Sequence, residues 1–341
     1  MRRCQVTGTR EICLRKHPVG SLGVDDFETV ERELAAPDKG EVQVRNLWMS
    51  VDPVTRLRMN RNDDQNIAPP AFALGDVLDG GAVGEVIASR DPAFAIGDLV
   101  QSWLGWREAF NAPASSLQKL DPGGLPPQSF LGAAGATGLV GYVGLVHVGR
   151  PKDGEVIFVS SAAGAVGLMV CQMAKAMGLK VIGSAGGPDK IALLREIGVD
   201  EVIDYKAAGD LTAALTAVAP EGIDIYFDNV GGEHLEAAIN AGRPSARIIL
   251  CGAISAYNGS EAPSGPRNLV LMIGKQMRME GVTLLAQLDK MAEYRSHLAS
   301  WISQGKITWR ETIVEGIERA PDALVRLFDG KVIGKMLVKL A

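Results

Sequence analysis

Cysteine and histidine are scarce in this sequence, and neither residue type forms a recognisable motif. Four of each occur among 341 residues, and the histidines lie far apart from one another. No CxxC pair is present, so nothing indicates a disulfide framework, and the scattered thiols fit a reducing cytosol. A catalytic zinc needs a convergent set of Cys, His or Glu ligands. We therefore expect a cytoplasmic protein without a metal ion. The residues concerned are Cys4, Cys13, Cys171 and Cys251, and His17, His147, His234 and His297.

Blocks of like charge are also missing. The net charge is −5, and acidic and basic residues are interspersed. No basic block would follow a phosphate backbone, so we expect no nucleic-acid partner. The first residues contain no apolar run typical of a signal peptide. Two uncharged stretches, 122–149 and 156–174, are long enough to span a bilayer, but their glycines and polar residues favour buried α/β core. We therefore expect no membrane partner.

Length and composition predict two globular domains. Hydrophobic residues make up 47% and charged residues 22% of the chain, which is an ordinary globular balance. The chain is also longer than one core of about 150 residues. The first third is predicted to be β-rich, because segments 41–47, 80–87 and 96–100 read as short strands separated by turns.

From residue 155 onward, apolar runs alternate with helical segments. The runs recur at intervals of roughly 24 residues, about the length of one βα unit. This alternation predicts an α/β fold with a Rossmann-type, doubly wound parallel sheet. Beyond the sheet, 291–304 and 321–328 read as helices and 334–340 as a final strand that returns to the amino-terminal domain. The runs expected to form the sheet are 155–160, 180–184, 201–204, 223–228 and 247–251.

The most informative local pattern follows the first of these strands. Residues 161–167 read SAAGAVG, with alanine at the first of the three usual glycine positions. Such a turn brings backbone N–H groups to a helix start, where the helix dipole favours a pyrophosphate. An NAD site usually has an acid about 20 residues further on, at the end of the second strand. Here that strand ends in Gly183-Ser184, and Lys190 follows, which favours NADP over NAD.

Two further loops follow strands at the same predicted sheet edge. Tyr257 lies in the loop after the fifth strand and can donate a phenol proton to an oxyanion, although packing on a neighbour would explain it equally well. Asn229 follows the fourth strand and either contacts a nicotinamide or serves the turn before a helix. Both interpretations stay open.

Together these segments resemble the zinc-free branch of the medium-chain dehydrogenases/reductases. They are most similar to the leukotriene B4 12-hydroxydehydrogenase / 15-oxoprostaglandin 13-reductase family, which includes alkenal double-bond reductases and curcumin-reductase-like proteins. The resemblance covers essentially the whole chain. It rests on 50–53, 161–167, 226–232, 251–258 and 278–281. The chain departs from the family pattern at Val54, Val140 and Val332, near the substrate and nicotinamide end.

The resemblance implies a GroES-like β-rich domain over 1–128 and 309–341, around a Rossmann domain over 129–308. It implies NADPH as cofactor and a homodimer. The pyrophosphate would contact the glycine turn, the 2′-phosphate Lys190 and Tyr205, and the ribose and nicotinamide the later loops. The implied cofactor-binding residues are Ala163, Gly164, Ala165, Val166, Gly167, Gly186, Lys190, Tyr205, Asn229, Cys251, Gly252, Ala253, Ile254, Ser255, Tyr257, Val282, Thr283 and Leu284.

The function expected from these features is NADPH-dependent reduction of the activated C=C bond of α,β-unsaturated ketones or aldehydes. NADPH would give hydride to the β-carbon. The cofactor's ribose hydroxyl, and Tyr257 if it is catalytic, would stabilise the enolate, and the α-carbon would take its proton from solvent or from Tyr257. The alternatives are quinone reduction or oxidation of a secondary alcohol on the same scaffold, and a non-catalytic NADPH-binding sensor.

Overall fold

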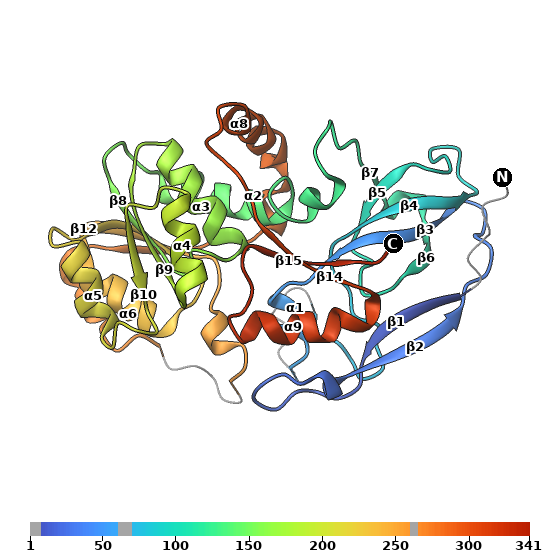
Figure 1. Cartoon of the computed structure of the whole chain (residues 1–341), viewed down its shortest axis with the longest axis horizontal. Coiled ribbons are helices and arrows are strands. Elements are labelled where there is room, and N and C mark those ends of the chain that lie inside the picture. Colours follow the sequence, from blue (N-terminus) through green and yellow to red (C-terminus); the bar gives the residue numbers. More distant parts are fainter. Residues whose placement is uncertain (1–7, 61–69, 260–264) are drawn as a thin grey trace. The chain divides into compact units, whose positions relative to one another are not determined.

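The computed structural model describes residues 8–60, 70–259 and 265–341, and its contacts divide the chain into two compact units. Unit 1 comprises Met1–Leu131, Glu311–Val332 and Met336–Ala341, and unit 2 comprises Gly132–Arg310 and Ile333–Lys335. The sequence places the domain borders at 128/129 and 308/309. The amino-terminal residues 1–7, including Cys4, lie outside the described ranges. Figure 1 shows both units and labels many of their elements.

Unit 1 is built on a β-sheet of seven described strands. The order is β14-β15-β3-β4-β5-β7, and β6 also pairs with β3. The carboxyl-terminal strand β15 runs antiparallel to β3, with Leu337 opposite Ser50, so the predicted tail strand does join the amino-terminal sheet. The elements are β1 (Gly8–Leu14), β2 (Phe27–Glu33), β3 (Glu41–Ser50), α1 (Val54–Arg58), β4 (Ala82–Ser89), β5 (Leu99–Ser102), β6 (Ala109–Pro113), β7 (Gln118–Lys119), β14 (Glu311–Glu315), α9 (Ala320–Phe328) and β15 (Lys335–Lys339).

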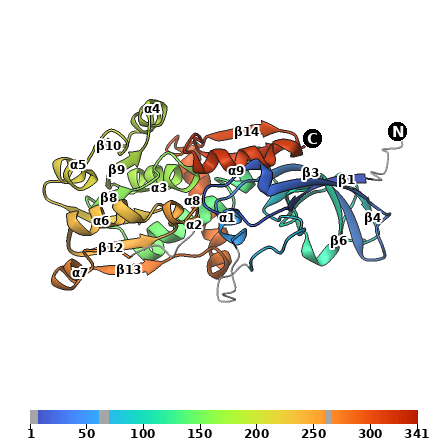
Figure 2. The same ribbon diagram turned by 90° about the horizontal axis from the view of Figure 1, so that it is seen from below.

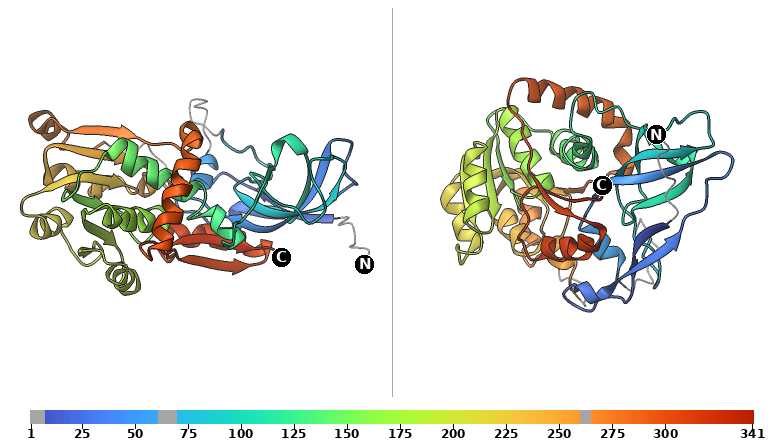
Figure 3. Two further views of the ribbon diagram at one scale, coloured as in Figure 1. Left: turned by 90° about the horizontal axis from the view of Figure 1, so that it is seen from above. Right: turned by 45° about the vertical axis from the view of Figure 1, so that its right-hand side comes forward.

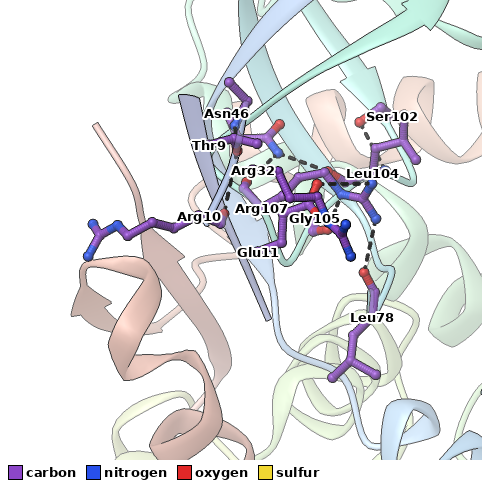
Figure 4. Close-up of polar contacts among 11 residues, drawn as sticks. Thr9, Arg10, Glu11, Arg32, Asn46, Leu78, Ser102, Leu104, Gly105 and Arg107 are labelled. Atoms are coloured by element: carbon purple, nitrogen blue, oxygen red, sulfur yellow. Dashed lines mark hydrogen bonds and ion pairs between the residues drawn. The ribbon is translucent and has the colours of Figure 1, made fainter. Parts of the chain in front are cut away.

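Buried charge fixes the β1–β2 hairpin in unit 1. Glu11 of β1 is 7% exposed and accepts a hydrogen bond from Nε of Arg32 at 2.8 Å. Its other oxygen lies 4.0 Å from the guanidinium of Arg107, which also donates to the carbonyls of Gly105 and Leu78 (Figure 4). Burial lowers the pKa of Arg107, and the negative charge of Glu11 opposes that shift. Glu11 therefore compensates the charge of Arg107, whose side chain is 15% exposed, where the hairpin meets the sheet.

Unit 2 contains a parallel sheet of six described strands, in the order β10-β9-β8-β11-β12-β13. The order reverses after β8, so β9 and β10 lie on one side of it and β11 to β13 on the other. This confirms the doubly wound α/β class. The elements are α2 (Ala136–Val143), β8 (Val156–Val159), α3 (Ala165–Ala176), β9 (Lys180–Ala185), α4 (Pro188–Glu196), β10 (Glu201–Asp204), α5 (Leu211–Val218), β11 (Ile223–Asp228), α6 (Gly232–Ala241), β12 (Gly242–Leu250), α7 (Val270–Lys275), β13 (Arg278–Gly281) and α8 (Met291–Ser303).

Helices cover both faces of this sheet (Figures 2 and 3). Phe158, Ile182, Tyr226 and Ile248, one from each of four strands, are buried in a cluster that also contains residues of α5 and α6. Residues in strands alternate between faces, so a continuous apolar surface of this kind requires the β-branched and aromatic runs seen in the sequence. Within the described ranges, no helix combines the length and apolarity needed to cross a bilayer.

Three features of unit 2 differ from the sequence prediction. Strand β12 begins at Gly242 rather than at 247, and β13 adds a sixth strand over Arg278–Gly281 where a family motif was seen but no strand was predicted. In addition, α2 continues as a π-helix over Gly144–Gly149, a local widening that apolar periodicity does not reveal.

Candidate functional site

The carboxyl edge of the parallel sheet in unit 2 brings together most of the predicted site residues. The turn from β8 into α3 begins with Ser161 in the left-handed region, at φ 48°. Ala162 N–H then donates to the carbonyl of Ser184 on β9 at 2.9 Å. Gly164 precedes α3 and supplies no side-chain cap. The first turn of α3 therefore keeps backbone N–H groups for an anion, as a phosphate-binding helix start requires.

Close packing explains why residue 167, the last of this turn, is a glycine. A Cβ at Gly167 would lie 2.8 Å from Cα of Ala162 and would overlap the carbonyl oxygen of Ser161. Only glycine lets α3 approach the turn this closely. The carboxyl-terminal segment adds a contact that the sequence did not predict, since Gly334 N–H donates to the carbonyl of Ala163 at 2.8 Å. The turn residues Ala163, Gly164, Ala165, Val166 and Gly167 therefore form a cradle that fits a pyrophosphate.

Cationic side chains gather beyond the ends of β9 and β10. Burial lowers the pKa of Lys190, and the like charge of Lys206 lowers it further, so the two ammonium groups are near each other. A Cβ at Gly186 would lie 2.9–3.1 Å from the side chain of Lys206, which shows that Lys206 runs along this loop. Tyr205 is 41% exposed at the same place. Two converging cations with exposed donors suit a phosphate group. Lys206 was not predicted from the sequence.

A buried pair, His234 and Ser184, lies next to Tyr205. His234 of α6 is 6% exposed, and its Nε2 lies 2.8 Å from the hydroxyl of Ser184. Its ring also meets that of Tyr205 edge-on, at 5.2 Å between centroids. Burial lowers the pKa of His234 to about 4, so the imidazole is neutral at pH 7. His234, which looked isolated in the sequence, therefore connects Ser184 of β9 with the ring of Tyr205.

At the strand-order reversal, β8 and β11 are joined by polar contacts. Asn229 donates from Nδ2 to the carbonyl of Ser160 at 2.7 Å and from its backbone N–H to the Ser160 hydroxyl at 3.0 Å. Asp228 is 1% exposed, and one of its oxygens, Oδ1, accepts from the N–H groups of Val230 at 2.9 Å and Gly231 at 2.7 Å and from the hydroxyl of Tyr226 at 2.7 Å. The side chain of Asn229 thus serves the turn, and its contact with a nicotinamide stays a prediction.

The loop after β12 is tied to the loop after β11. Cys251 and Gly252 donate their N–H groups to the carbonyl of Asp228 at 2.9 and 3.0 Å. The hydroxyl and N–H of Ser255 both donate to the carbonyl of Val230. Ile254 N–H donates to the backbone carbonyl of Asn229 at 3.4 Å. These bonds fix the backbone that carries Tyr257.

Tyr257 is half-buried in this loop and keeps its proton. Ala253 N–H donates to the phenol oxygen at 3.3 Å, so this contact leaves the phenol hydrogen for another acceptor. Burial raises the pKa of Tyr257, and the charge of Asp228 contributes to the shift. Burial also raises the pKa of Cys251 to about 12, so its thiol is protonated at neutral pH. The loop therefore offers the neutral phenol of Tyr257 as a proton donor and contains no thiolate nucleophile.

The last predicted segment follows β13. Val282 N–H donates to the carbonyl of Leu250 at 3.0 Å, which places the segment beside the end of β12. Val282 and Leu284 are half-buried and Thr283 is exposed. Their backbone contact with a nicotinamide stays a prediction.

Comparison with known proteins agrees with this architecture. Residues 10–120 match the family described as "N-terminal domain of oxidoreductase", and residues 165–303 match "Zinc-binding dehydrogenase". The chain is 42% identical to the putative NADP-dependent oxidoreductase YfmJ of Bacillus subtilis, over 97% of this chain and 98% of that protein. It is 38% identical to an NADP+-dependent 2-alkenal reductase of Nicotiana tabacum, over 97% of each chain. The chain belongs to this family of medium-chain oxidoreductases.

A solved structure supports the same assignment. The NADPH complex of CurA from Vibrio vulnificus is 36% identical to this chain, covers 97% of it and 99% of its own length, and superimposes with a TM-score of 0.91. The predicted family membership is thereby confirmed, together with the pairing of a Rossmann-type sheet with a β-rich part.

Side chains that could bind a metal ion do not cluster among the residues that the structure describes. No three His, Cys, Asp or Glu side chains there are grouped as a metal would require. Cys13 and His17 are four residues apart, but Cys13 is buried and Nδ1 of His17 lies 2.9 Å from the carbonyl of Met59. His147 and His297 contact Glu293 and Tyr142, respectively, in unit 2. Independence from metal stays a prediction.

Proposed function

We propose that this protein uses NADPH to reduce the activated C=C bond of α,β-unsaturated ketones or aldehydes. The observation that carries the proposal is the set of groups along one sheet edge. A phosphate cradle, a pair of lysines and a half-buried neutral tyrosine lie at the ends of successive strands of unit 2. Relatives named 2-alkenal reductase, NADPH-dependent curcumin reductase and (+)-pulegone reductase support the same chemistry.

The cofactor would supply the hydride for the β-carbon, and the chain supplies binding, orientation and a proton. The backbone N–H groups at the start of α3 hold the pyrophosphate, and Lys190 and Tyr205 hold the 2′-phosphate. The loops that carry Asn229 and the 251–257 segment line the ribose and nicotinamide. The phenol of Tyr257 donates to the enolate oxygen or delivers the proton to the α-carbon. Hydrogen bonds from Ser255 and Cys251 keep this loop in place.

The decisive experiment is a substrate panel with NADPH and NADH in parallel. Purified protein should consume NADPH in the presence of simple enones and alkenals, prefer NADPH to NADH, and keep its activity after treatment with a chelator. Inertness towards all enones, alkenals and quinones would overturn the proposal. Turnover of quinones alone would favour the quinone reductase, and tight NADPH binding without any turnover would favour the sensor.

We also propose that the protein is a homodimer associated through the β13 side of unit 2. Strand β13 is the last strand of the sheet as described, and edge strands invite pairing. The neighbouring helix α7 exposes Val270 at 69% and Ile273 at 78%, an apolar patch that a second copy would cover. Ile273→Glu should convert a dimer to monomers in light scattering. Ile96→Glu, at an isoleucine of unit 1 that is 61% exposed, should not. A monomeric wild type would contradict this proposal.

The cytoplasmic location also stays a prediction.

A further inference from the structure

The carboxylate of Asp228 has two unequal oxygens. Oδ1 accepts four hydrogen bonds, from Val230, Gly231, Tyr226 and, at 3.4 Å, the hydroxyl of Ser160. Oδ2 is buried and has no hydrogen-bond partner among the described residues. The side chain is 1% exposed. A buried charge is normally paired, because desolvation costs more than isolated hydrogen bonds return.

Hydrogen bonding alone does not require the charge at this position. The amide oxygen of an asparagine could accept hydrogen bonds from the same donors without a negative charge. Burial raises the pKa of Asp228, while the turn N–H groups and Tyr226 oppose the shift by stabilising the ionised form. The effect of the charge also reaches the loop after β12, where it contributes to the raised pKa of Cys251 and of Tyr257. Asp228 therefore acts on that loop electrostatically.

The topology places this charge beside the nicotinamide half of a bound dinucleotide. Dinucleotides lie across the point where strand order reverses, with one mononucleotide half on each side. The two lysines and Tyr205 assign the 2′-phosphate, and with it the adenosine, to the side of β9 and β10. The nicotinamide half then belongs to the side of β11 to β13. Asp228 ends β11, the first strand on that side.

We propose that the carboxylate of Asp228 favours the oxidised, cationic nicotinamide over the reduced, neutral one, and so sets the relative affinity of the site for NADP⁺ and NADPH. This inference rests on the proposed function for the placement of the cofactor. The role is one of electrostatic positioning, because the side chain lies beneath the turn rather than against the reacting atoms. A fixed anion in a partly buried site would lower the cost of forming the cationic ring during hydride transfer.

The test is the ratio of two dissociation constants, Kd for NADP⁺ over Kd for NADPH, measured by fluorescence titration without any substrate. Asp228→Asn should raise this ratio about tenfold over the wild type, because loss of the anion removes its attraction for the cationic ring but leaves binding of the neutral ring unchanged. Because both constants come from the same preparation, a fraction of misfolded protein cancels in the ratio. Asp228→Ser, whose hydroxyl can accept from one turn amide, is a second neutral variant should the first fail to fold.

The matched control is Asp224→Asn. Asp224 lies on the same strand near its other end and pairs with Arg243 at 2.7 Å. Removal of its charge should leave the ratio within twofold of the wild type. A ratio that also stays within twofold in Asp228→Asn and Asp228→Ser overturns the inference and leaves Asp228 a purely structural turn residue. If the wild type binds neither nucleotide, the proposed function fails instead. If it binds both nucleotides but reduces no enone, the inference about Asp228 is still decided by the ratio of the two dissociation constants.

Discussion

Nε2 of His234 lies 2.8 Å from the hydroxyl of Ser184, and both side chains are buried in unit 2. Burial lowers the pKa of His234 to about 4, against about 6.5 in an unfolded chain. As the pH falls, the unfolded chain therefore takes up a proton first. The stability tied to neutral His234 is complete above about pH 6.5 and is lost progressively towards pH 4.

This linkage predicts a measurable pH dependence. Between pH 7.5 and pH 5, the wild type should lose about 2 kcal/mol more of its free energy of unfolding than His234→Gln, which cannot titrate. Urea unfolding at the two pH values measures the difference. Carboxyl groups that titrate in the same range affect both proteins and cancel in the comparison. Identical pH dependence of the two proteins would show that His234 is not held neutral by the fold.

Lys190 and Lys206 should together determine the preference for a 2′-phosphate. Replacement of either by glutamine removes one of two converging charges, so NADPH should bind about tenfold more weakly while NADH changes by less than twofold. Adenosine 2′,5′-bisphosphate, titrated calorimetrically, isolates the phosphate contribution from that of the nicotinamide. Lys180→Gln, an exposed lysine at the opposite end of β9, should bind NADPH as the wild type does. Equal losses of affinity for NADPH and NADH would mean that the 2′-phosphate does not bind at these lysines.

The sequence predicted the sheet of unit 2 well because its strands are buried on both faces. The run of β8 is wholly apolar, that of β11 has buried apolar and aromatic residues between Asp224 and Asp228, and the spacing of the runs matches βα units. Strand β13 escaped prediction because Arg278 and Gly281 are exposed at the sheet edge, where a strand need not be apolar. The early start of β12 escaped because Pro244 and Ser245, one of them at positive φ, interrupt its pattern.

The site was predicted only in part, for a different reason. Glycine turns and strand-end loops have local signals, so the segment 161–167 and Tyr257 could be found from sequence. Lys206 and His234 could not, because their roles depend on contacts with Gly186 and Ser184, residues 20 and 50 positions away. The unequal oxygens of Asp228 are likewise visible only once the turn after β11 is folded.

Tyr257→Phe distinguishes the proposed proton donor from a packing tyrosine. If the phenol assists the reaction, kcat for an enone should fall by about 100-fold or more, with little change in KM or in NADPH binding. Because burial raises its pKa, Tyr257 stays protonated near neutral pH, so the wild-type rate should show no loss from tyrosine ionisation there. Tyr142→Phe, which removes a buried phenol bonded to Glu293, should lower stability but keep turnover. Near-normal turnover in Tyr257→Phe would favour a ribose-only or quinone mechanism.

Glu11→Ala should destabilise unit 1, because the partly buried guanidinium of Arg107 would then lose the negative charge of Glu11. Loss of one partner of such a pair costs about 3 kcal/mol, whereas Glu11→Gln keeps acceptors for Arg32 and should cost less. Glu28→Ala on the same hairpin removes an exposed carboxylate and should change stability by no more than about 0.5 kcal/mol. Urea unfolding of the three variants ranks these costs. If Glu11→Ala and Glu28→Ala were equally stable, Arg107 would have to be satisfied by the carbonyls of Gly105 and Leu78 alone, and the hairpin would be held by its backbone hydrogen bonds rather than by charge.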